Sequence, residues 1–556
     1  MFQALLFKCI RNKEKLLKLT DKSALLNTFL SMRMLKTIRT FTIALMISQL
    51  NNTSLVNAQS VDSTKEMTYR PAFHFAPPQN WTNDPNGLVF YNDQYHIFYQ
   101  YNPEGDTWGH MSWGHATSKD MMKWEHQPVA LQDYPNGNGT STMFFSGTAV
   151  VDKNNTSGFG KKDGEIPLVA IYTAHIDSSG TGISQSQSLA YSLDGKQFTR
   201  YDKNPLIDLH TRDFRDPKVF WQEQSKQWIM IVAKPLDFKV QLYASPDLKS
   251  WSLLSEFGDK FGDKSKIWEC PDIFELPVEN EPGTTKWVIT VSGGHPQQNG
   301  NLGMQYFIGN FDGKTFTPDI LQYPLYLDYG KDFYAGIIFN NLPDNDKRKI
   351  MIGWENSWEY AATTPSKGFR GQMSVPRELS IYKNENSEYR IKSFPVREVT
   401  SYRGQLLATQ NSVAVTGSKL LNSISGSTLD IEFIIKKSSA EQAGIKLLKH
   451  GENQTLVYYN KIDNTLKIDR TKSGNVGFGP KFPSIESVPM PDTNDDIAIR
   501  ILVDRNNIEV FANGGKQVMT DLVFPLSEKV SYELFSTEVA TTFKNINIWE
   551  MKTSME

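Results

Sequence analysis

Three acidic residues that lie far apart in the chain share one local pattern, in which a proline follows within two positions and a strand-like run begins. They stand in the segments Asn83-Asp84-Pro85, Arg215-Asp216-Pro217 and Glu269-Cys270-Pro271. Proline keeps the residue before it out of the helical region, so these positions are expected to be extended. Carboxyl groups in one pocket raise one another's pKa, and cleavage of a glycosidic bond needs one protonated and one ionised acid. Asp84, Asp216 and Glu269 are therefore candidate catalytic acids.

Side chains that suit a sugar lie near the same hairpin ends. The tryptophans there are Trp81, Trp108, Trp113, Trp268, Trp354 and Trp358, whose flat rings can stack on sugar rings or fill the core. Asn83, Gln100, Ser146 and Arg215 can bond hydroxyl groups. His110 and His115 have no third ligand nearby in the sequence, so we interpret them as structural and predict no metal site.

A repeated hairpin pattern indicates which elements position these residues. An Asp followed four residues later by an aromatic residue recurs at Asp120 and Trp124, Asp194 and Phe198, Asp247 and Trp251, and Asp312 and Phe316. Five pairs of apolar runs interleave with it, at 87–101, 146–175, 218–233, 272–293 and 336–354. Such a repeat predicts a five-bladed β-propeller rather than stacked sandwiches, which would not explain the regular turn. Equivalent points of different blades converge on the propeller axis, so the three acids are expected to share one pocket.

After the repeat, the composition changes to alternating apolar and polar residues with regular turns, as in 429–437 and 497–515. This pattern is typical of a β-sandwich. The fold class is therefore predicted as all-β, with a propeller over 72–390, a linker over 391–405 and a sandwich over 406–556.

Composition and the N-terminal segment bear on the setting of the protein. The 556 residues carry 59 Lys plus Arg and 61 Asp plus Glu, which argues against a nucleic-acid partner. Residues 1–58 resemble a signal-peptide region, with a true start near Met34, Lys36 and Arg39 ahead of a short apolar run, and Val56-Asn57-Ala58 as a cleavage site. That run is too short to span a bilayer. We expect an exported protein, periplasmic or extracellular and of bacterial origin.

Several ordered motifs resemble glycoside hydrolase family 32, the β-fructosidases, which include invertases, inulinases and levanases. The matching segments are WTNDPNG at 81–87, FSGT at 145–148, FRDP at 214–217, WECPDIFEL at 268–276, DYGKDFYA at 328–335, GWENSWEYA at 353–361 and DRNNIEVFANGG at 504–515. The resemblance runs from about residue 72 to the end of the chain. Thr82 departs from the family pattern, which commonly has Met at that position.

The resemblance implies a retaining mechanism and a role for each acid. Asp84 would be the nucleophile, Glu269 the general acid and base, and Asp216 the group that stabilises the transition state. Trp268 and Cys270 beside Glu269 indicate an apolar setting that would keep this acid protonated. The other substrate-binding candidates are Asn83, Gln100, Trp108, Phe145, Ser146, Arg215, Asp328 and Trp354. Asp328 is expected near the acid and base, although a salt-bridged loop is an equal alternative.

The expected activity is release of terminal β-D-fructofuranosyl units from levan, inulin and sucrose, without a cofactor. The alternatives are an endo-acting levanase or inulinase, an inverting arabinanase-type propeller, and a non-catalytic fructan-binding protein. The presence of all three acids argues against the last of these. The sequence does not decide between linkages, between exo and endo action, or between oligomeric states, and it leaves transfer of fructose to another sugar open.

Overall fold

The computed structural model describes residues 69–162, 164–294, 303–319, 324–422, 424–491 and 495–554. The chain divides into two units, residues 1–66 and residues 67–556. The predicted signal-peptide region 1–58, with Met34, lies outside the described residues. Everything below concerns the second unit.

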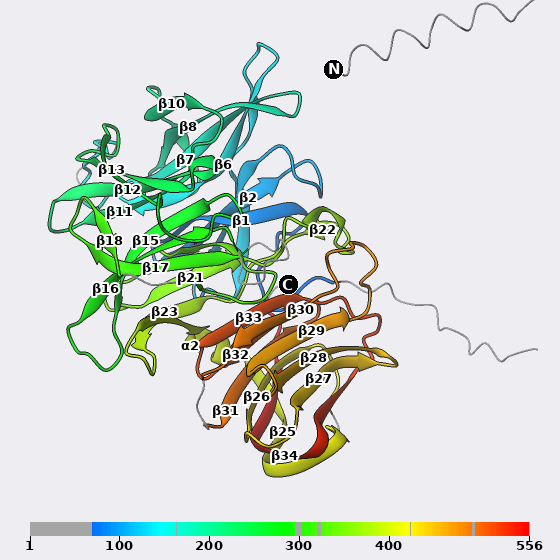
Figure 1. The fold of residues 1–556 in the computed structure, drawn as a ribbon. Coiled ribbons are helices and arrows are strands. Elements are labelled where there is room, and N and C mark those ends of the chain that lie inside the picture. The colour runs from blue at the N-terminus through cyan, green and yellow to red at the C-terminus, as the bar shows by residue number, and fades with distance from the viewer. Residues whose placement is uncertain are drawn as a thin grey trace, which may run out of the picture. The chain divides into compact units, whose positions relative to one another are not determined.

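Five sheets follow one another along the first part of this unit and form the blades of a propeller (Figure 1). Blade one holds β1 (Asn80–Tyr91), β2 (Gln94–Asn102), β3 (Ser112–Ser118) and β4 (Trp124–Leu131), and blade two holds β5 (Tyr134–Pro135), β6 (Ser141–Val151), β7 (Leu168–Ser178), β8 (Thr181–Ser192), β9 (Thr199–Arg200) and β10 (Ile207–Thr211). Blade three holds β11 (Arg215–Gln222), β12 (Gln227–Lys234), β13 (Lys239–Ser245) and β14 (Ser252–Phe257). Blade four holds β15 (Glu269–Pro277), β16 (Thr285–Ser292), β17 (Met304–Phe311), β18 (Phe316–Pro318) and β19 (Leu325–Tyr326). Blade five holds β20 (Tyr334–Ile338), β21 (Lys349–Trp354), β23 (Arg377–Lys383) and β24 (Tyr389–Pro395), and β22 (Phe369–Arg370) pairs with β1 of blade one.

Strand β12 shows why these apolar runs become strands of stacked blades. Its residues 228–233 are all buried. Ile229 and Ile231 belong to the core shared with blade four, whereas Met230 and Val232 belong to the core shared with blade two. Successive side chains of a strand point to opposite faces, and both faces of a blade are covered by its neighbours. A strand of such a blade therefore needs a continuous run of apolar residues, whereas a strand with one exposed face would alternate apolar and polar residues.

The five predicted hairpins and the repeated turn are present. Each hairpin joins the first two long strands of a blade in antiparallel register. In blade one the Oδ1 atom of Asp120 accepts the backbone N–H groups of Met122 and Lys123 at 3.0 and 2.8 Å. The aspartates at 194, 247 and 312 cap their turns in the same way. An aspartate that satisfies two backbone donors explains why the turn residue recurs.

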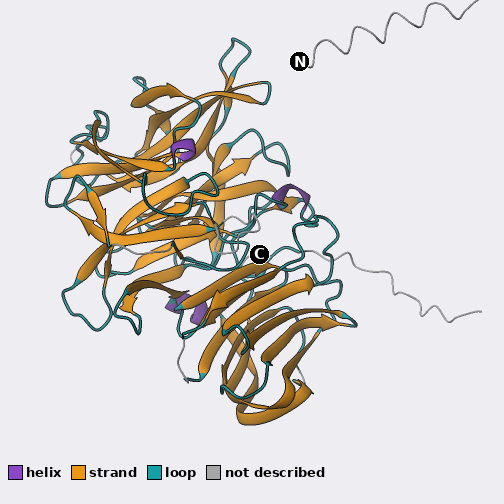
Figure 2. Cartoon of the chain, in the orientation of Figure 1, coloured by secondary structure: helices purple, strands orange, loops and turns teal. Residues whose placement is uncertain are grey.

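The second part of the unit is a β-sandwich (Figure 2). Its strands are β25 (Arg403–Leu420), β26 (Thr428–Ile435), β27 (Gln442–His450), β28 (Asn453–Asn460), β29 (Thr465–Lys472), β30 (Ile485–Pro489), β31 (Ile497–Asp504), β32 (Asn507–Ala512), β33 (Gln517–Leu522) and β34 (Ser531–Met551). The first part of β34 pairs with β27 and the last part with β26, so this strand passes from one layer to the other. Glu538 has a φ of 60° near that change, and Gly417 of the paired strand β25 has a φ of 69°.

Short helices complete the fold: the 3-10 helices η1 (Pro235–Asp237) and η2 (Ala361–Thr363), and the α-helix α2 (Arg397–Ser401). Strand β24 and α2 occupy most of the segment predicted as a linker. None of the helices in the described part of the chain has the length and apolar character that crossing a bilayer requires.

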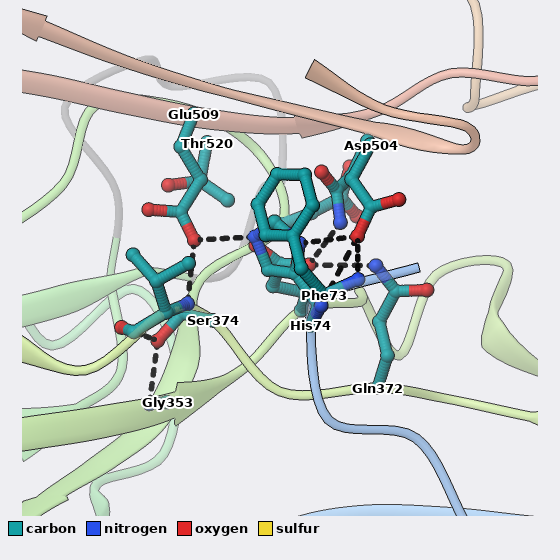
Figure 3. A network of polar contacts seen from close by, with 12 residues as sticks. Phe73, His74, Gly353, Gln372, Ser374, Asp504, Glu509 and Thr520 are labelled. Atoms are coloured by element: carbon teal, nitrogen blue, oxygen red, sulfur yellow. Dashed lines mark hydrogen bonds and ion pairs between the residues drawn. The ribbon is translucent and has the colours of Figure 1, made fainter. Parts of the chain in front are cut away.

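A buried network of charged side chains joins the propeller to the sandwich, and Figure 3 shows its part around His74, Asp504 and Glu509. We call it the interface network; its members are His74, Asp328, Glu355, Arg377, Asp504 and Glu509. The Arg377 guanidinium lies 2.8 Å from Asp328 and 3.0 Å from Glu509. His74 lies between Asp504 and Glu509, with its ring nitrogens 2.9 and 3.1 Å from their carboxyl oxygens. The network therefore pairs cations of the propeller and of its N-terminal segment with anions of both domains.

Candidate active site

The three predicted acids lie on the innermost strands of blades one, three and four. In each of these strands the pairing register shifts at the acid, between Thr82 and Pro85, between Arg215 and Lys218, and between Glu269 and Asp272. Proline has no N–H to give to the ladder, so the prolines that follow the acids favour such an irregularity. The backbone of Asp216 has a φ of 65°, which is uncommon for a residue other than glycine. The local motif thus turns each carboxyl group out of the regular sheet.

Cys270 brings the two aspartates together. Its backbone N–H donates to Asp216 Oδ2 at 3.0 Å, and its sulfur lies 3.5 Å from Asp84 Oδ2 and 3.7 Å from Asp216 Oδ2. Burial and the neighbouring acids raise the pKa of the thiol well above its usual value, so it remains a neutral donor. The Arg215 guanidinium links Glu269 to this pair, since it lies 3.0 Å from Glu269 and 4.0 Å from Asp216. We call Asp84, Asp216 and Glu269 the catalytic cluster.

Asp84 is buried and held by two side chains that the sequence had placed with it. Ser146 Oγ donates to Asp84 Oδ2 at 2.6 Å, and Asn83 Nδ2 donates to Oδ1 at 3.0 Å. The Asn83 side chain is itself fixed by the indole N–H of Trp81 at 2.8 Å. Burial raises the pKa of Asp84, the two hydrogen bonds oppose that rise, and the charge of Glu269 adds to it.

Asp216 is almost fully buried, and its setting favours the protonated form. Burial raises its pKa to about 7; the Arg215 guanidinium opposes this shift, and the charges of Glu269 and Asp84 increase it. Its backbone N–H donates to Thr173 Oγ1 at 3.0 Å. At a pH near 7, Asp216 therefore holds a proton in a substantial share of the molecules.

Glu269 is the most accessible acid, with a side chain 20% exposed against 6% for Asp216. Arg215 donates to its Oε1 through Nε and Nη2, both at 3.0 Å, and the Tyr334 hydroxyl donates to Oε2 at 2.7 Å. The apolar setting expected from Trp268 and Cys270 is wrong. Trp268 is fully buried in the core between blades, with its indole N–H bound to a backbone carbonyl, and Cys270 faces the aspartates.

Tyr334 and Cys270 are contacts that the sequence reasoning missed. Tyr334 lies in the segment 328–335 that was matched to the family, but no role was given to it. Burial and the charge of Glu269 raise the pKa of Tyr334 well above its usual value, so its hydroxyl keeps the proton that it donates.

A row of aromatic rings lies beside the cluster. Trp108 is 45% exposed and meets the edge of Phe145 at a centroid distance of 6.0 Å. Phe145 stacks on His175 at 4.1 Å. Trp108 and Phe145 therefore offer the ring surface that was predicted for substrate binding.

Trp354 and Gln100, two of the predicted substrate-binding residues, are buried. Trp354 has no exposed surface, and its ring packs on Trp81 and Trp358 at 6.2 and 4.9 Å. Trp358 is the member of this group that reaches the surface, at 38% exposed. Gln100 is buried and donates its amide to the carbonyl of Phe144 at 2.9 Å.

Asp328 does not join the catalytic cluster. It is buried in the interface network, where Arg377, the Thr520 hydroxyl and two backbone N–H groups bind its carboxylate. The expectation that it lies beside Glu269 is therefore wrong, and the alternative of a salt-bridged loop describes its contacts. Its partners lie 49 and 192 residues away in the sequence.

One group of side chains in the described part of the chain has the spacing of a metal site. His74, Glu355 and Glu509 offer ligand atoms within 4.8 Å of one another. Burial alone would lower the pKa of His74, but Glu355, Asp504 and Glu509 raise it to about 10. A protonated imidazole has no free lone pair, and the Arg377 guanidinium already lies beside Glu509. The group is thus occupied by its own cations and does not fit a metal.

The two histidines interpreted as structural lie apart from each other. His115 is buried, stacks on Phe98 at 4.3 Å and bonds to the ring of His96 at 3.0 Å. His110 is exposed and contacts Asp133 at 3.0 Å.

Comparison with known proteins identifies matches over almost all of the described unit. The profile described as "Glycosyl hydrolases family 32 N-terminal domain" matches residues 74–394, and "Glycosyl hydrolases family 32 C terminal" matches residues 398–550. The chain is 43% identical to a levanase of Bacillus subtilis over 90% of this chain and 73% of that protein. It is 39% identical to the extracellular exo-inulinase of Aspergillus niger over 87% of this chain and 94% of that protein. The crystal structure of exo-inulinase from Aspergillus awamori superposes with a TM-score of 0.81 at 38% identity, covering 88% of this chain and all of that one.

Proposed function

The chain belongs to glycosyl hydrolase family 32, as its motifs predicted, and on that premise we propose that it removes terminal β-fructosyl units from fructans and sucrose with retention of configuration. It is a glycosidase, and its relatives include enzymes named levanase, exo-inulinase and invertase. The observation that carries the proposal is the meeting of three carboxyl groups around Cys270 with one guanidinium between them.

In the proposed mechanism Asp84 attacks the anomeric carbon of the fructosyl unit. The Ser146 hydroxyl and the Asn83 amide hold its two oxygens in fixed directions, which favours a single attacking geometry. Formation of the fructosyl ester removes the negative charge of Asp84 from a buried setting that raises its pKa.

Glu269 gives a proton to the leaving oxygen and then takes one from the attacking water. Its greater exposure suits a group that must meet first a leaving sugar and then water. Arg215 and Tyr334 hold both of its oxygens throughout. Asp216, whose pKa burial raises to about 7, is proposed to bond the ring hydroxyls and to stabilise the transition state.

Exo action and export belong to the same proposal. Relatives named extracellular exo-inulinase match at 39% identity, and the residues that resemble a signal peptide suit export from a bacterial cell. Chromatography of the products from levan and from inulin tests the mode of action. Fructose alone is expected, and a ladder of oligosaccharides would show endo action instead.

The role of Glu269 is tested with Glu269→Ala on sucrose and on an aryl β-fructofuranoside with a good leaving group. General acid assistance is worth about 10²–10⁴ in rate, so kcat on sucrose falls by this factor. The activated substrate needs little protonation and retains much more of its rate. An equal loss on both substrates would contradict the assignment of Glu269 as the acid.

A further inference from the structure

A cavity of about 770 Å³ is lined by the ends of the innermost strands that lie away from the catalytic cluster. The same innermost strands line both sites: β11 runs from Asp216 to Trp221, and β15 runs from Glu269 to Glu275. At about 3.3 Å per residue, five residues of strand separate Asp216 from Trp221 by roughly 16 Å. The volume of the cavity lies within the range of about 300–1,000 Å³ that is usual for ligand sites.

A buried ion pair lies between the two sites. Lys218 Nζ is 3.3 Å from Asp272 Oδ2, and both side chains are almost fully buried. Asp272 also accepts the backbone N–H groups of Ile273 and Ile338 at 2.8 and 2.9 Å. These groups satisfy one another at the floor of the cavity, so a chain held in the cavity does not thread through to the catalytic cluster.

The walls of the cavity combine aromatic rings with polar groups. Phe220 and Trp287 face each other at 5.6 Å and are partly exposed, as is Trp221. The indole N–H of Trp221 donates to Glu223 at 2.8 Å, which fixes the direction of that ring. Partly exposed rings that are fixed in place provide flat surfaces for the CH faces of sugars.

The charges around the cavity balance. Three cations, Lys153, Lys218 and Lys349, face three anions, Glu223, Asp272 and Glu275. This balance favours a neutral ligand over an anion, for which a surplus of positive charge would be needed. The Lys349 ammonium makes no hydrogen bond or ion pair with the described residues, and burial lowers its pKa. It is therefore a donor available to a ligand hydroxyl.

We propose that this cavity is a second saccharide-binding site, which takes a neutral oligosaccharide segment of the fructan. The choice of fructan as the bound sugar rests on the proposed function, whereas the assignment of a saccharide site rests on the cavity itself. A polymer chain held there keeps the enzyme on its substrate while another chain end occupies the catalytic cluster. The site therefore favours polymers over sucrose without taking part in the chemistry.

The test uses Asp84→Asn, which blocks hydrolysis, in native gels that contain levan or inulin and an excess of sucrose to fill the catalytic site. Retardation by the polymer is expected to persist under these conditions. Lys349→Met and Trp221→Ala are expected to weaken the apparent affinity at least several-fold. Trp251→Ala, on the same blade but outside the cavity, is the matched control and is expected to retain it.

Equal retardation of Lys349→Met and the control, or no retardation in excess sucrose, would overturn the proposal. Lys349→Met decides the matter if Trp221→Ala does not fold. Retention by dextran sulfate that depends on Lys349 would overturn the choice of a neutral ligand. With Asp84 intact, both cavity variants are expected to hydrolyse sucrose at the wild-type rate. These outcomes differ from failure of the proposed function itself. If that function were wrong, the wild type would hydrolyse neither sucrose nor fructan.

Discussion

The interface network and the catalytic cluster are both buried groups of charged side chains, but they differ in how their charges are paired. In the interface network, Arg377 lies between Asp328 and Glu509, and His74 is held protonated by the acids around it. In the catalytic cluster the single guanidinium of Arg215 contacts Glu269 at 3.0 Å and Asp216 at 4.0 Å and also pairs with Asp213 at 3.0 Å, while Asp84 is held by neutral donors.

The difference shows which acids of each group keep a proton. Burial penalises every ionised group, and a paired cation offsets that penalty. In the network, Arg377 and His74 offset the penalty for Glu509, whose pKa is lowered to about 2, whereas burial raises the pKa of Glu355 well above its usual value. In the cluster the offset is incomplete, so the pKa values of Asp84 and Asp216 rise and a proton remains to be exchanged. Incomplete pairing of Asp84 and Asp216 costs stability, and formation of the fructosyl ester on Asp84 relieves part of that cost.

The largest expected effect distinguishes Asp84, a buried aspartate of the catalytic cluster, from Asp328, a buried aspartate of the interface network. Asp84→Asn removes the nucleophile, and kcat on sucrose should fall by about 10⁴–10⁶, the size of loss seen when a covalent nucleophile is removed. Its melting temperature should stay at or above that of the wild type, because a poorly compensated charge is gone. Asp328→Asn is the matched control, and it should lose stability while keeping activity per folded molecule. If Asp328→Asn lost activity without losing stability, the comparison would fail.

The second effect concerns the paired cluster alone. Arg377→Met leaves Asp328 and Glu509 buried without their guanidinium, and loss of one partner from a buried pair costs about 3–5 kcal/mol. Urea unfolding should show that decrease in the free energy of unfolding. Arg397→Met is the control, since Arg397 is 80% exposed and contacts Glu398 at 3.5 Å, where exposed pairs contribute about 0–1 kcal/mol. Equal losses in the two variants would show that the network does not stabilise the fold.

Much of the fold and of the catalytic cluster could be predicted from local sequence. The turns at Asp120 and its equivalents are encoded within four residues, because the side chain caps its own turn. The acids at 84, 216 and 269 are marked by the prolines beside them, which interrupt the sheet ladder at those points. The repeat then places them on the axis, because equivalent strands of a propeller converge there.

The contacts that were not predicted depend on partners far away in the chain. Asp328 lies in a family motif, but its place is set by Arg377 and Thr520, which local sequence does not reveal. Cys270 was interpreted as apolar, whereas its φ of 46° accompanies a backbone turn that aims its N–H and sulfur at two aspartates. Side-chain direction at an irregular strand position follows from that backbone turn, and the residue type does not state it.

A third effect is the contribution of Asp216 to the pH dependence of stability. The pKa of Asp216 is about 7 in the folded protein and near 3.8 when unfolded. Between about pH 4 and 7 the folded form holds a proton that the unfolded chain has released, so the stability of the wild type falls as pH rises through this window. Asp216→Asn does not lose stability in this window, so above pH 7 its free energy of unfolding should exceed that of the wild type by on the order of 1–3 kcal/mol. Near pH 4 most of this difference between the two proteins should disappear.

Thermal unfolding of wild type and Asp216→Asn at a series of pH values measures this difference. Asp332→Asn, a change to a buried acid that Arg470 pairs at the domain interface, is the control and should lose stability at neutral pH. A constant offset between wild type and Asp216→Asn from pH 4 to 8 would contradict the raised pKa.

The smallest effect concerns the neutral donor beside Glu269. Tyr334→Phe removes the hydroxyl that donates to Glu269 Oε2 at 2.7 Å and keeps the buried ring. We expect kcat on sucrose to fall by about tenfold, since a hydrogen bond to a charged group is worth about 1.5–3 kcal/mol and Arg215 still holds the other oxygen. Tyr334 is a positioning residue, so its loss should matter less for an aryl fructoside that needs little proton transfer. If the rates on both substrates fell equally, Tyr334 would support the fold of the pocket rather than the proton transfer by Glu269.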